Sequence, residues 1–231
     1  MKLLVIRHGT PDYEHDCLTE QGRAEAELLA KRLMCEDIAA VYTSPMGRAR
    51  ETAEAYTRLS GQEAAVCEWL HEFDVAVNDT ELGRRVITWD LRPEYWTKSG
   101  LLYDRREYRN APEVTGTEMF ERSEKVRQGL DRLLAEHGLI REGEVFRRAG
   151  DTDKTLALFC HFGAGCVVTA HLLGISPMLT LQGFSADPTA VATLCTDDRF
   201  GEYVNFRLHG YGDTTHLGVS HGERKKELKA K

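Results

Sequence analysis

The sequence opens with a short apolar run that ends directly in an arginine, a histidine and a glycine. The run from Leu3 to Ile6 is too short for a helix and is typical of a strand buried on both faces in a parallel sheet. Open α/β sheets place ligand sites just beyond the carboxyl ends of such strands. Arg7 and His8 stand at that point, and Gly9 lets the backbone turn. A guanidinium grips two phosphate oxygens and a neutral imidazole can act as a nucleophile, so this end of the strand is a candidate phosphate site.

A second strand end repeats this arrangement late in the chain. The apolar segment 155–160 is followed by His161 and by a glycine-containing turn into a helix that runs through Leu173. Two histidines at the ends of strands in one parallel sheet can converge on one point, and the N-terminus of the following helix directs N–H groups at an anion. Arg48 lies in the first turn of another predicted helix and can reach across the same strand ends. We therefore expect Arg7, His8, Arg48 and His161 to meet.

Alternating strand and helix signals in the first seventy residues predict an α/β fold. Strands are expected at 38–42 and 66–70, and helices are expected to begin at the N-caps Thr19 and Ser44, with Pro45 at the first helical position. This order favours a parallel sheet with right-handed crossovers. Later elements are expected as a helix from the cap Thr117 to about Gly138, a turn or hairpin at 144–154, and strands at 155–160, 191–195 and 203–208. The predicted fold class is a three-layer αβα sandwich with a mostly parallel central sheet.

The alternation breaks between about residues 73 and 116, which we interpret as an inserted cap. We expect a single domain over 1–222 that includes this cap, followed by a charged, disordered tail at 223–231. The cap is rich in aromatic and basic side chains: Trp89, Tyr95, Trp96, Tyr103 and Tyr108, and Arg84, Arg85, Arg92, Lys98, Arg105, Arg106 and Arg109. Two interpretations stay open, a small separate core with solvated charges, or a cap whose arginines face a substrate.

Composition narrows the expected partners and compartment. The 231 residues carry a formal net charge of −7, so no basic field attracts nucleic acid or an anionic membrane. No stretch is apolar enough to span a bilayer, and the start of the sequence has no signal-peptide pattern, so a cytoplasmic protein is expected. The six cysteines form no C-x-x-C pair and are expected to be mostly small buried hydrophobes, without a structural metal. The sequence leaves the oligomeric state open.

Five segments, taken in order along the chain, resemble signatures of the histidine phosphatase superfamily, the phosphoglycerate-mutase-like fold. They are Ile6-Arg7-His8-Gly9-Thr10, Leu18-Thr19-Glu20-Gln21-Gly22, the block Ser44-Pro45-Met46-Gly47-Arg48-Ala49-Arg50-Glu51-Thr52-Ala53, Cys160-His161-Phe162-Gly163, and Asp213-Thr214-Thr215-His216-Leu217. No single piece is specific, but the combination is, and it covers nearly the whole chain.

The resemblance implies a role for each matching residue. His8 would attack phosphorus and become phosphohistidine, while Arg7, Arg48 and His161 surround the phosphoryl oxygens. Because the arginines supply positive charge, no metal or other cofactor is required. His8 must be neutral to attack, so we expect a backbone carbonyl to accept the N–H of its other ring nitrogen and fix the tautomer.

The expected proton donor and a possible further phosphate ligand rest on the same resemblance. Glu72 matches the position of the carboxylic acid that protonates the leaving alkoxide and then deprotonates the attacking water. The family often continues there with a glycine-containing stretch, whereas this chain reads Phe73-Asp74-Val75-Ala76, so Asp74 is the reserve. Thr10 is expected either to add a hydroxyl bond to the phosphate or to serve only in the turn.

The resemblance favours a metal-independent phosphomonoester hydrolase that acts on a small phosphorylated metabolite through a phosphohistidine. The first alternative is a mutase that passes the phosphoryl group to a second hydroxyl. Mutases of the family carry an arginine pair and a proline-rich stretch in the insert, which Arg105-Arg106 and Pro112 match only faintly. The second alternative is a catalytically inactive regulator that binds phosphate.

Overall fold

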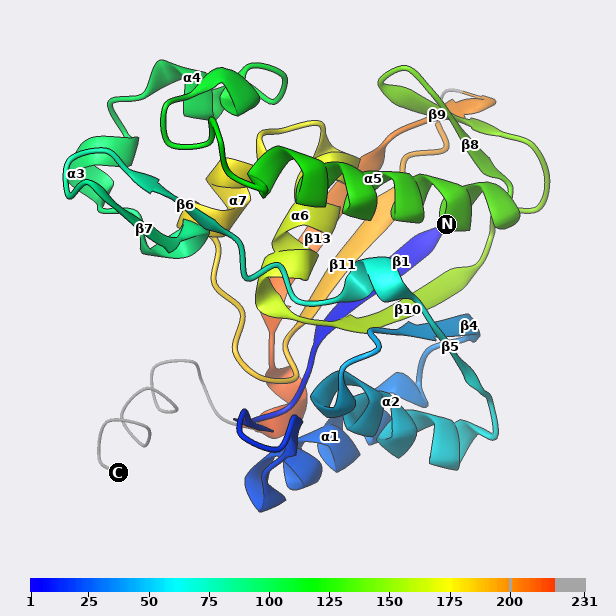
Figure 1. Ribbon diagram of the computed structural model, residues 1–231. Helices are drawn as coiled ribbons and strands as arrows, with labels where there is room; N and C mark the ends of the chain where they lie inside the picture. The colour runs from blue at the N-terminus through cyan, green and yellow to red at the C-terminus, as the bar shows by residue number, and fades with distance from the viewer. Residues whose placement is uncertain (200, 219–231) are drawn as a thin grey trace.

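A computed structural model of the chain describes residues 1–199 and 201–218 as three layers (Figure 1). A six-stranded sheet forms the middle layer, with α1 (Glu20–Leu33) and α2 (Gly47–Ser60) on one face and α5 (Met119–Glu136) and α6 (Phe162–Leu173) on the other. The predicted three-layer α/β fold class is confirmed. The expected tail at 223–231 and the boundary at 222 lie outside the described residues, and the domain limits remain predictions.

The central sheet has the order β13-β11-β1-β10-β4-β5. Its strands are β1 (Lys2–Arg7), β4 (Ile38–Thr43), β5 (Ala64–Val66), β10 (Thr155–Cys160), β11 (Val191–Thr196) and β13 (Phe206–Asp213). The pairs β1–β10, β10–β4 and β4–β5 are parallel, whereas β11 runs antiparallel to both β1 and β13. Because β1 and β10 pair in register from Lys2↔Thr155 to Arg7↔Cys160, their carboxyl ends lie side by side.

Alternate side chains of the central strands separate two hydrophobic cores. Leu3 and Val5 of β1 join the core beneath α5 and α6, whereas Leu4 and Ile6 join the core beneath α1 and α2. β10 divides in the same way, with Leu158 in the first core and Phe159 in the second. A strand that is buried on both faces needs apolar residues at every position, which explains the uninterrupted run at the start of the sequence.

Several expected element limits are confirmed and others are wrong. Thr19 caps α1, with its side chain accepting from the Gly22 N–H. The expected start at Ser44–Pro45 is wrong, because α2 begins at Gly47 and the Ser44 hydroxyl instead accepts from the Met46 N–H at 3.3 Å. The predicted strand at 66–70 is also wrong, because β5 ends at Val66 and a 3-10 turn, η1 (Glu68–Leu70), follows it.

In the second half of the chain, the observed element limits differ less from the expected ones. The hairpin expected at 144–154 lies earlier, as β8 (Leu139–Glu142) and β9 (Val145–Arg148). The strand expected at 203–208 is divided between β12 (Tyr203–Val204), which pairs with β9, and β13 of the central sheet. Thr117 lies two residues before α5, and its hydroxyl accepts from the Met119 N–H at 3.3 Å.

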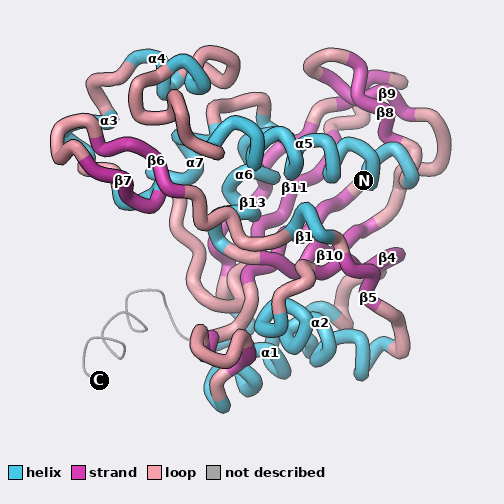
Figure 2. Tube along the Cα trace, viewed as in Figure 1, coloured by secondary structure: helices cyan, strands magenta, loops and turns pink. Residues whose placement is uncertain are grey.

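The cap, which joins η1 to α5, is mostly loop with short elements (Figure 2). They are the hairpin β6 (Ala76–Asp79) and β7 (Arg84–Ile87), the helices α3 (Pro93–Trp96) and α4 (Gly100–Tyr103), and the 3-10 turns η2 (Thr88–Asp90) and η3 (Tyr108–Asn110). The expectation of a separate cap core is wrong, because Leu102 and Tyr108 are buried in the same cluster as the sheet residues beneath α5 and α6.

The remaining elements complete the molecule. They are the short pair β2 (Pro11–Asp12) and β3 (Cys17–Leu18), the helix α7 (Pro177–Gly183) and the 3-10 turn η4 (Thr215–Leu217). Of the cysteines, Cys160 and Cys166 are buried and Cys35 is exposed, so fewer are core residues than expected. Within the described residues, no helix combines the length and the apolar character that a membrane span requires.

Candidate active site

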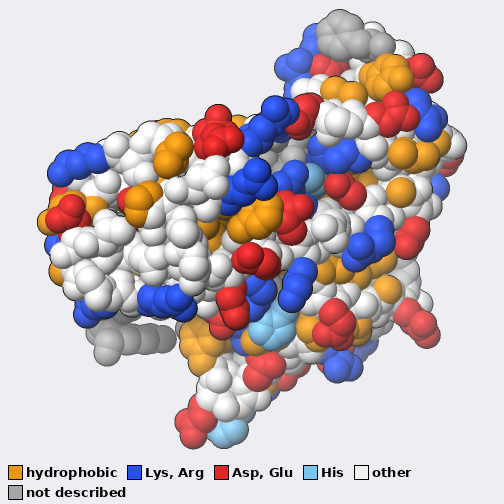
Figure 3. Space-filling view, turned by 45° about the horizontal axis from the view of Figure 1, so that its top comes forward, with side chains coloured by type: hydrophobic (Ala, Val, Ile, Leu, Met, Phe, Trp, Pro, Cys, Tyr) orange, Lys and Arg blue, Asp and Glu red, His pale blue; other side chains and the backbone are white. Residues whose placement is uncertain are grey.

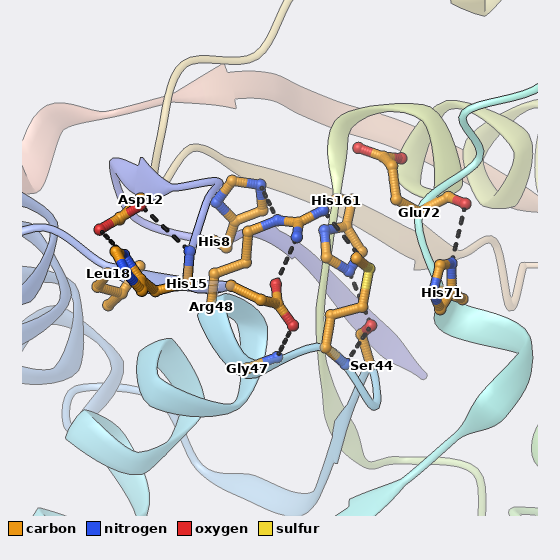
Figure 4. A network of polar contacts seen from close by, with 12 residues as sticks. His8, Asp12, His15, Leu18, Ser44, Gly47, Arg48, His71, Glu72 and His161 are labelled. Atoms are coloured by element: carbon orange, nitrogen blue, oxygen red, sulfur yellow. Dashed lines mark hydrogen bonds and ion pairs between the residues drawn. The ribbon is translucent and has the colours of Figure 1, made fainter.

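The two strand-end histidines converge as the sequence predicts. The His8 N–H donates to the Cys160 carbonyl at 2.9 Å, which ties the end of β1 to the end of β10. The His8 and His161 rings are 5.2 Å apart between centroids, and both residues are buried. The Arg48 side chain comes from α2, and Figure 4 shows it beside both histidines. The fold therefore brings three of the four expected phosphate-pocket side chains directly together.

The imidazole of His8 is held in one tautomer by two contacts. Nδ1 lies 2.7 Å from the Gly9 carbonyl, to which it donates, as expected from the sequence. Nε2 is then the acceptor, and Arg48 Nε donates to it at 3.3 Å. Burial lowers the pKa of His8 to about 3, and the neighbouring Arg7 and Arg48 charges act in the same direction. His8 is therefore neutral near pH 7, with the Nε2 lone pair facing the arginine.

His161 has one nitrogen engaged and the other without a partner. Its Nε2 is 2.7 Å from the Ser44 hydroxyl, which belongs to the loop after β4. Its Nδ1 is buried and makes no hydrogen bond to any residue among 1–199 and 201–218. Burial lowers the pKa of His161 to about 2, and the charges of His8 and Arg48 add to the effect. A buried polar atom without a partner costs free energy, so Nδ1 is a point where a bound group would stabilise the site.

Arg48 is the most constrained cation of the site. It is buried in the first turn of α2, and its Nη1 donates to Asp16 Oδ1 at 2.5 Å. The guanidinium carbon also lies 5.4 Å from the centre of the Tyr13 ring. Both Asp16 and Tyr13 come from the loop that joins β1 to α1, so this loop covers one side of the arginine.

Arg7 and Thr10 flank His8 along the chain but have different surroundings. Arg7 Nη1 donates to the Ala186 carbonyl at 2.5 Å, and its Nε is buried without a hydrogen-bond partner among the described residues. Thr10 donates its backbone N–H and its hydroxyl to the Glu25 carboxylate, each at 2.9 Å. The contacts of Thr10 thus fit its expected role in the turn, and its hydroxyl proton is engaged away from the histidines.

Glu72 lies against the start of α6, beside His161. Its Oε1 accepts from the Phe73, Gly163 and Ala164 N–H groups at 2.7, 3.0 and 3.3 Å. Burial nevertheless raises the pKa of Glu72, and these backbone hydrogen bonds only partly offset the effect. Asp74, the reserve, has a side chain that is 62% exposed and lies 3.7 Å from Arg122 Nη2.

Apolar rings bound the site on the Glu72 side. The Trp89 ring of the cap meets the Phe162 ring edge-on, with 5.4 Å between centroids. A Cβ on Gly163 would stand 2.8 Å from Trp89, 2.9 Å from the Phe73 carbonyl oxygen and 3.0 Å from Glu72 Oε1. A side chain at position 163 would therefore crowd the ring, the backbone and the carboxylate, which explains the glycine in physical terms.

Three residues that hold the site together were not expected in these roles. Asp16 pairs with Arg48, the Ser44 hydroxyl contacts His161, and Arg122 Nη2 donates to the Glu72 carbonyl at 3.0 Å. Ser44 had a sequence signal that pointed only to a helix cap. Asp16 and Arg122 had no signal, because each acts across a loop whose path the local pattern does not specify.

The cap arginines that resemble the mutase pair lie far from the histidines. Arg105 and Arg106 both pair with Glu144 of the β8–β9 turn, and Arg105 Nη1 stands 2.9 Å from where a Cβ of Gly174 would lie. Gly174 follows α6, whose 12 residues span roughly 18 Å. The pair thus lies about a helix length from His161.

These residues line a cavity of about 360 Å³ between the cap, α5 and the end of α6. In Figure 3, blue and red side chains alternate along the notch between the cap and the β8–β9 hairpin. Arg127 also lines the cavity and pairs with Glu124 at 2.6 Å. Glu144 and Glu124 therefore partly compensate the charges of these three arginines, and this cavity is separate from the catalytic candidates.

Comparison with known proteins finds a matching family model and similar curated proteins. A family model described as the histidine phosphatase superfamily (branch 1) matches residues 3–208. A probable phosphatase of Schizosaccharomyces pombe is 25% identical over 233 residues, which cover 94% of this chain and 95% of the yeast protein. A probable phosphoglycerate mutase of Photorhabdus laumondii is 28% identical over 110 residues, which cover 44% of this chain and 50% of that protein.

Solved structures share the fold at low sequence identity. A mutant phosphoserine phosphatase from Entamoeba histolytica, in complex with phosphoserine, has a TM-score of 0.60 and 21% identity, covering 94% of this chain and 98% of that chain. A mycobacterial glucosyl-3-phosphoglycerate phosphatase has a TM-score of 0.60 and 19% identity, covering 91% of this chain and 98% of that chain. Because the family model runs from the first strand into the last strand of the central sheet, the chain belongs to the histidine phosphatase superfamily and is an enzyme of the phosphatase type.

Proposed function

We propose that the chain hydrolyses a small phosphomonoester, without a metal, through a phosphohistidine formed on His8. The observation that carries this proposal is the state of the His8 imidazole. Its Nδ1–H is fixed on the Gly9 carbonyl, so the Nε2 lone pair points to the position beside Arg48 and His161. A buried neutral imidazole with a fixed tautomer is a prepared nucleophile.

In the first step Nε2 of His8 attacks phosphorus as Arg48 Nε turns from Nε2 to a phosphoryl oxygen. The bond from phosphorus to the ester oxygen breaks, and Glu72 gives its proton to that oxygen. In the second step Glu72 takes a proton from water, the resulting hydroxide attacks phosphorus, and phosphate leaves as the P–N bond breaks. Arg7, Arg48 and His161 Nδ1 stabilise the phosphoryl oxygens throughout.

Glu72 is the proposed proton donor rather than Asp74. A buried carboxyl with a raised pKa keeps its proton to a higher pH than an ordinary glutamic acid, which suits a general acid. Asp74 is mostly exposed and faces Arg122, away from the histidines. We include Thr10 among the proposed site residues only through its support of the turn after His8, since Glu25 engages its hydroxyl.

The test is release of inorganic phosphate by the purified chain in the presence of EDTA. The substrates are phosphoserine, 3-phosphoglycerate and glucosyl-3-phosphoglycerate, since structural neighbours bind or hydrolyse compounds of these names, together with sugar phosphates and p-nitrophenyl phosphate. His8→Ala is expected to lose at least about 10³-fold in kcat, and His209→Ala, an exposed histidine on β13, to retain full activity.

Rapid quenching distinguishes the alternatives. A phosphohydrolase accumulates an acid-labile, alkali-stable phosphoenzyme that is absent from His8→Ala. Interconversion of 3- and 2-phosphoglycerate without phosphate release identifies a mutase instead. Binding of phosphate with neither release nor phosphoenzyme identifies the inactive regulator, and full activity in His8→Ala contradicts the nucleophile assignment.

A further inference from the structure

The carboxylate of Asp16 is hydrogen-bonded to the Arg48 guanidinium, which the proposed reaction needs as a phosphoryl ligand. Asp16 Oδ1 accepts from Arg48 Nη1 at 2.5 Å, and Asp16 Oδ2 accepts from the Gly47 N–H at 2.7 Å. Both donors belong to the first turn of α2, and Figure 4 shows Arg48 beside His8 and His161. One carboxylate therefore spans two donors at the edge of the phosphate pocket.

The backbone around Asp16 is shaped for this contact. Asp16 has φ of +48°, a conformation that non-glycine residues seldom adopt and that costs about 1 kcal/mol or more. A Cβ on Gly47 would stand 2.1 Å from the Asp16 carbonyl oxygen, so only glycine lets the loop come this close to α2. A strained residue packed against an obligatory glycine indicates that the position of this carboxylate is specifically built.

A second acid organises the loop without reaching the site. Asp12 Oδ1 accepts from the Glu14 and His15 N–H groups at 3.0 and 3.3 Å, and Asp12 Oδ2 lies 2.8 Å from His15 Nδ1. The loop therefore holds its shape through Asp12, while the carboxylate of Asp16 is free to serve Arg48.

Each nitrogen of the Arg48 guanidinium has one contact, which together use three of its five N–H groups, and the only charged partner among the described residues is Asp16. Nε donates to His8 and Nη1 to Asp16, while Nη2 lies 3.5 Å from the Met46 sulfur, a weak acceptor. A carboxylate and a phosphoryl group seek the same guanidinium hydrogen bonds. The Asp16 side chain is 44% exposed, so water can solvate its charge once it leaves Arg48.

We infer that Asp16 is a positioning residue that competes with substrate and product phosphate for Arg48, and that it sets how loosely the site holds phosphate. While the site is empty, Asp16 keeps the guanidinium oriented and its charge compensated. When a phosphoryl group binds the same guanidinium, the Asp16 carboxylate lies close to a second anion and repels it, which favours release of the product. The inference depends on the proposed function only in taking Arg48 as a phosphoryl ligand.

The test is the dissociation constant for inorganic phosphate, measured by calorimetry on the wild-type chain and on Asp16→Asn. Asparagine tolerates a positive φ and keeps an oxygen for the Gly47 N–H, so it removes the charge and little else. Asp16→Asn is expected to bind phosphate about tenfold more tightly, since it replaces a charge-assisted contact with a neutral one. Asp12→Asn makes the same change of charge in the same loop and is expected to stay within about twofold of wild type.

Kinetics give a readout that a purely structural role would not produce. Asp16→Asn is expected to lower KM for a phosphomonoester and the inhibition constant for phosphate together. Unchanged or weaker phosphate binding in Asp16→Asn would overturn the inference, because a residue that only orients Arg48 would weaken binding when altered. If Asp16→Asn does not fold, Asp16→Gly keeps the backbone conformation and is expected to tighten binding as well.

Arg48→Ala separates this inference from the proposed function. Loss of phosphate binding in Arg48→Ala, together with tighter binding in Asp16→Asn, supports both. Loss in Arg48→Ala with no change in Asp16→Asn overturns the competition and leaves the proposed function intact. Wild-type affinity in Arg48→Ala overturns both, because the phosphate would then bind elsewhere.

Discussion

The two ends of helix α6 each carry a buried histidine, and the two histidines differ in how their nitrogens are satisfied. His171, in the last turn, lies 2.8 Å from Asp131 Oδ1 through Nε2 and accepts from Arg127 Nε at 3.1 Å through Nδ1. His161, just before the first turn, has a hydroxyl on Nε2 and nothing on Nδ1 among the described residues. Burial lowers the pKa of both, although Asp131 opposes the shift at His171.

The arginines at the two ends differ in a similar way, except for Arg48, which pairs with Asp16 at the catalytic end. Arg127, Arg105 and Arg106 are each paired with a glutamate around the cavity at the far end. At the catalytic end, Arg7 Nη1 has a carbonyl partner, and its buried Nε has no hydrogen-bond partner among residues 1–199 and 201–218. Arginines and histidines occur at both ends of α6, so residue type alone does not identify a site, and the partners of their nitrogens distinguish the two ends.

Replacing each histidine with alanine should give the largest difference between the two ends of α6. His161→Ala is expected to lower kcat/KM by roughly 10²- to 10³-fold and to cost less stability than His171→Ala, because only the Ser44 hydroxyl among the described residues loses a hydrogen bond. His171→Ala is expected to cost about 1–3 kcal/mol in the free energy of unfolding, since Asp131 and Arg127 each lose a buried partner, and to leave kcat/KM within about threefold. Steady-state kinetics and urea unfolding measure both, and equal kinetic losses would show that the two ends do not differ in function.

A smaller effect is expected for Glu72→Gln, which removes the proposed acid at the catalytic end and should change the pH dependence of the rate. With a poor leaving group, such as an alkyl phosphate, we expect a loss of roughly 10²-fold, and with p-nitrophenyl phosphate a much smaller one. Because burial raises the pKa of Glu72, the wild-type rate with the alkyl ester should stay high above the ordinary range for a glutamic acid and then fall as this pKa is passed. Glu72→Gln should lack that fall, and equal losses with both esters would point to another acid.

Replacing the arginine pair of the cap, Arg105 and Arg106, should have the smallest effect on phosphate release. Arg105→Ala and Arg106→Ala remove exposed contacts to Glu144, and such contacts contribute little to stability. We expect phosphate release within about twofold of wild type for each variant and for the double variant, with nearly unchanged melting temperatures. A large loss of activity would mean that the cap moves to bring the pair to the substrate, as a mutase would require.

Much of the fold was predictable because its signals are local. An uninterrupted apolar run such as 3–6 or 155–160 indicates a strand buried on both faces, and Thr19 has a side chain that caps the next helix. Local signals failed where a competing contact decided the outcome. Ser44 resembles a helix cap, but its hydroxyl lies between His161 and the Met46 N–H, and α2 begins later.

The site residues that follow strand ends were predictable from the sequence, whereas those that loops bring to the site were not. His8, His161 and Arg48 are fixed by the sheet and by α2, so their meeting follows from topology. The placement of Asp16 depends on the path of the loop after His8. The placement of Arg122 depends on how α5 packs against the loop that carries Glu72. Neither path has a periodic sequence pattern, and both are set by tertiary contacts.

The central position of β1 has a consequence for synthesis on the ribosome. Its neighbours in the sheet are β10 and β11, so Lys2 pairs with Thr155 on one side and with Cys195 on the other. The growing chain must therefore carry the apolar strand β1 without either partner until more than half of the sequence has emerged. Contacts so distant in sequence slow folding and expose apolar surface meanwhile. Nascent chains are thus expected to depend on chaperones until β10 emerges, and the catalytic histidines come together only afterwards.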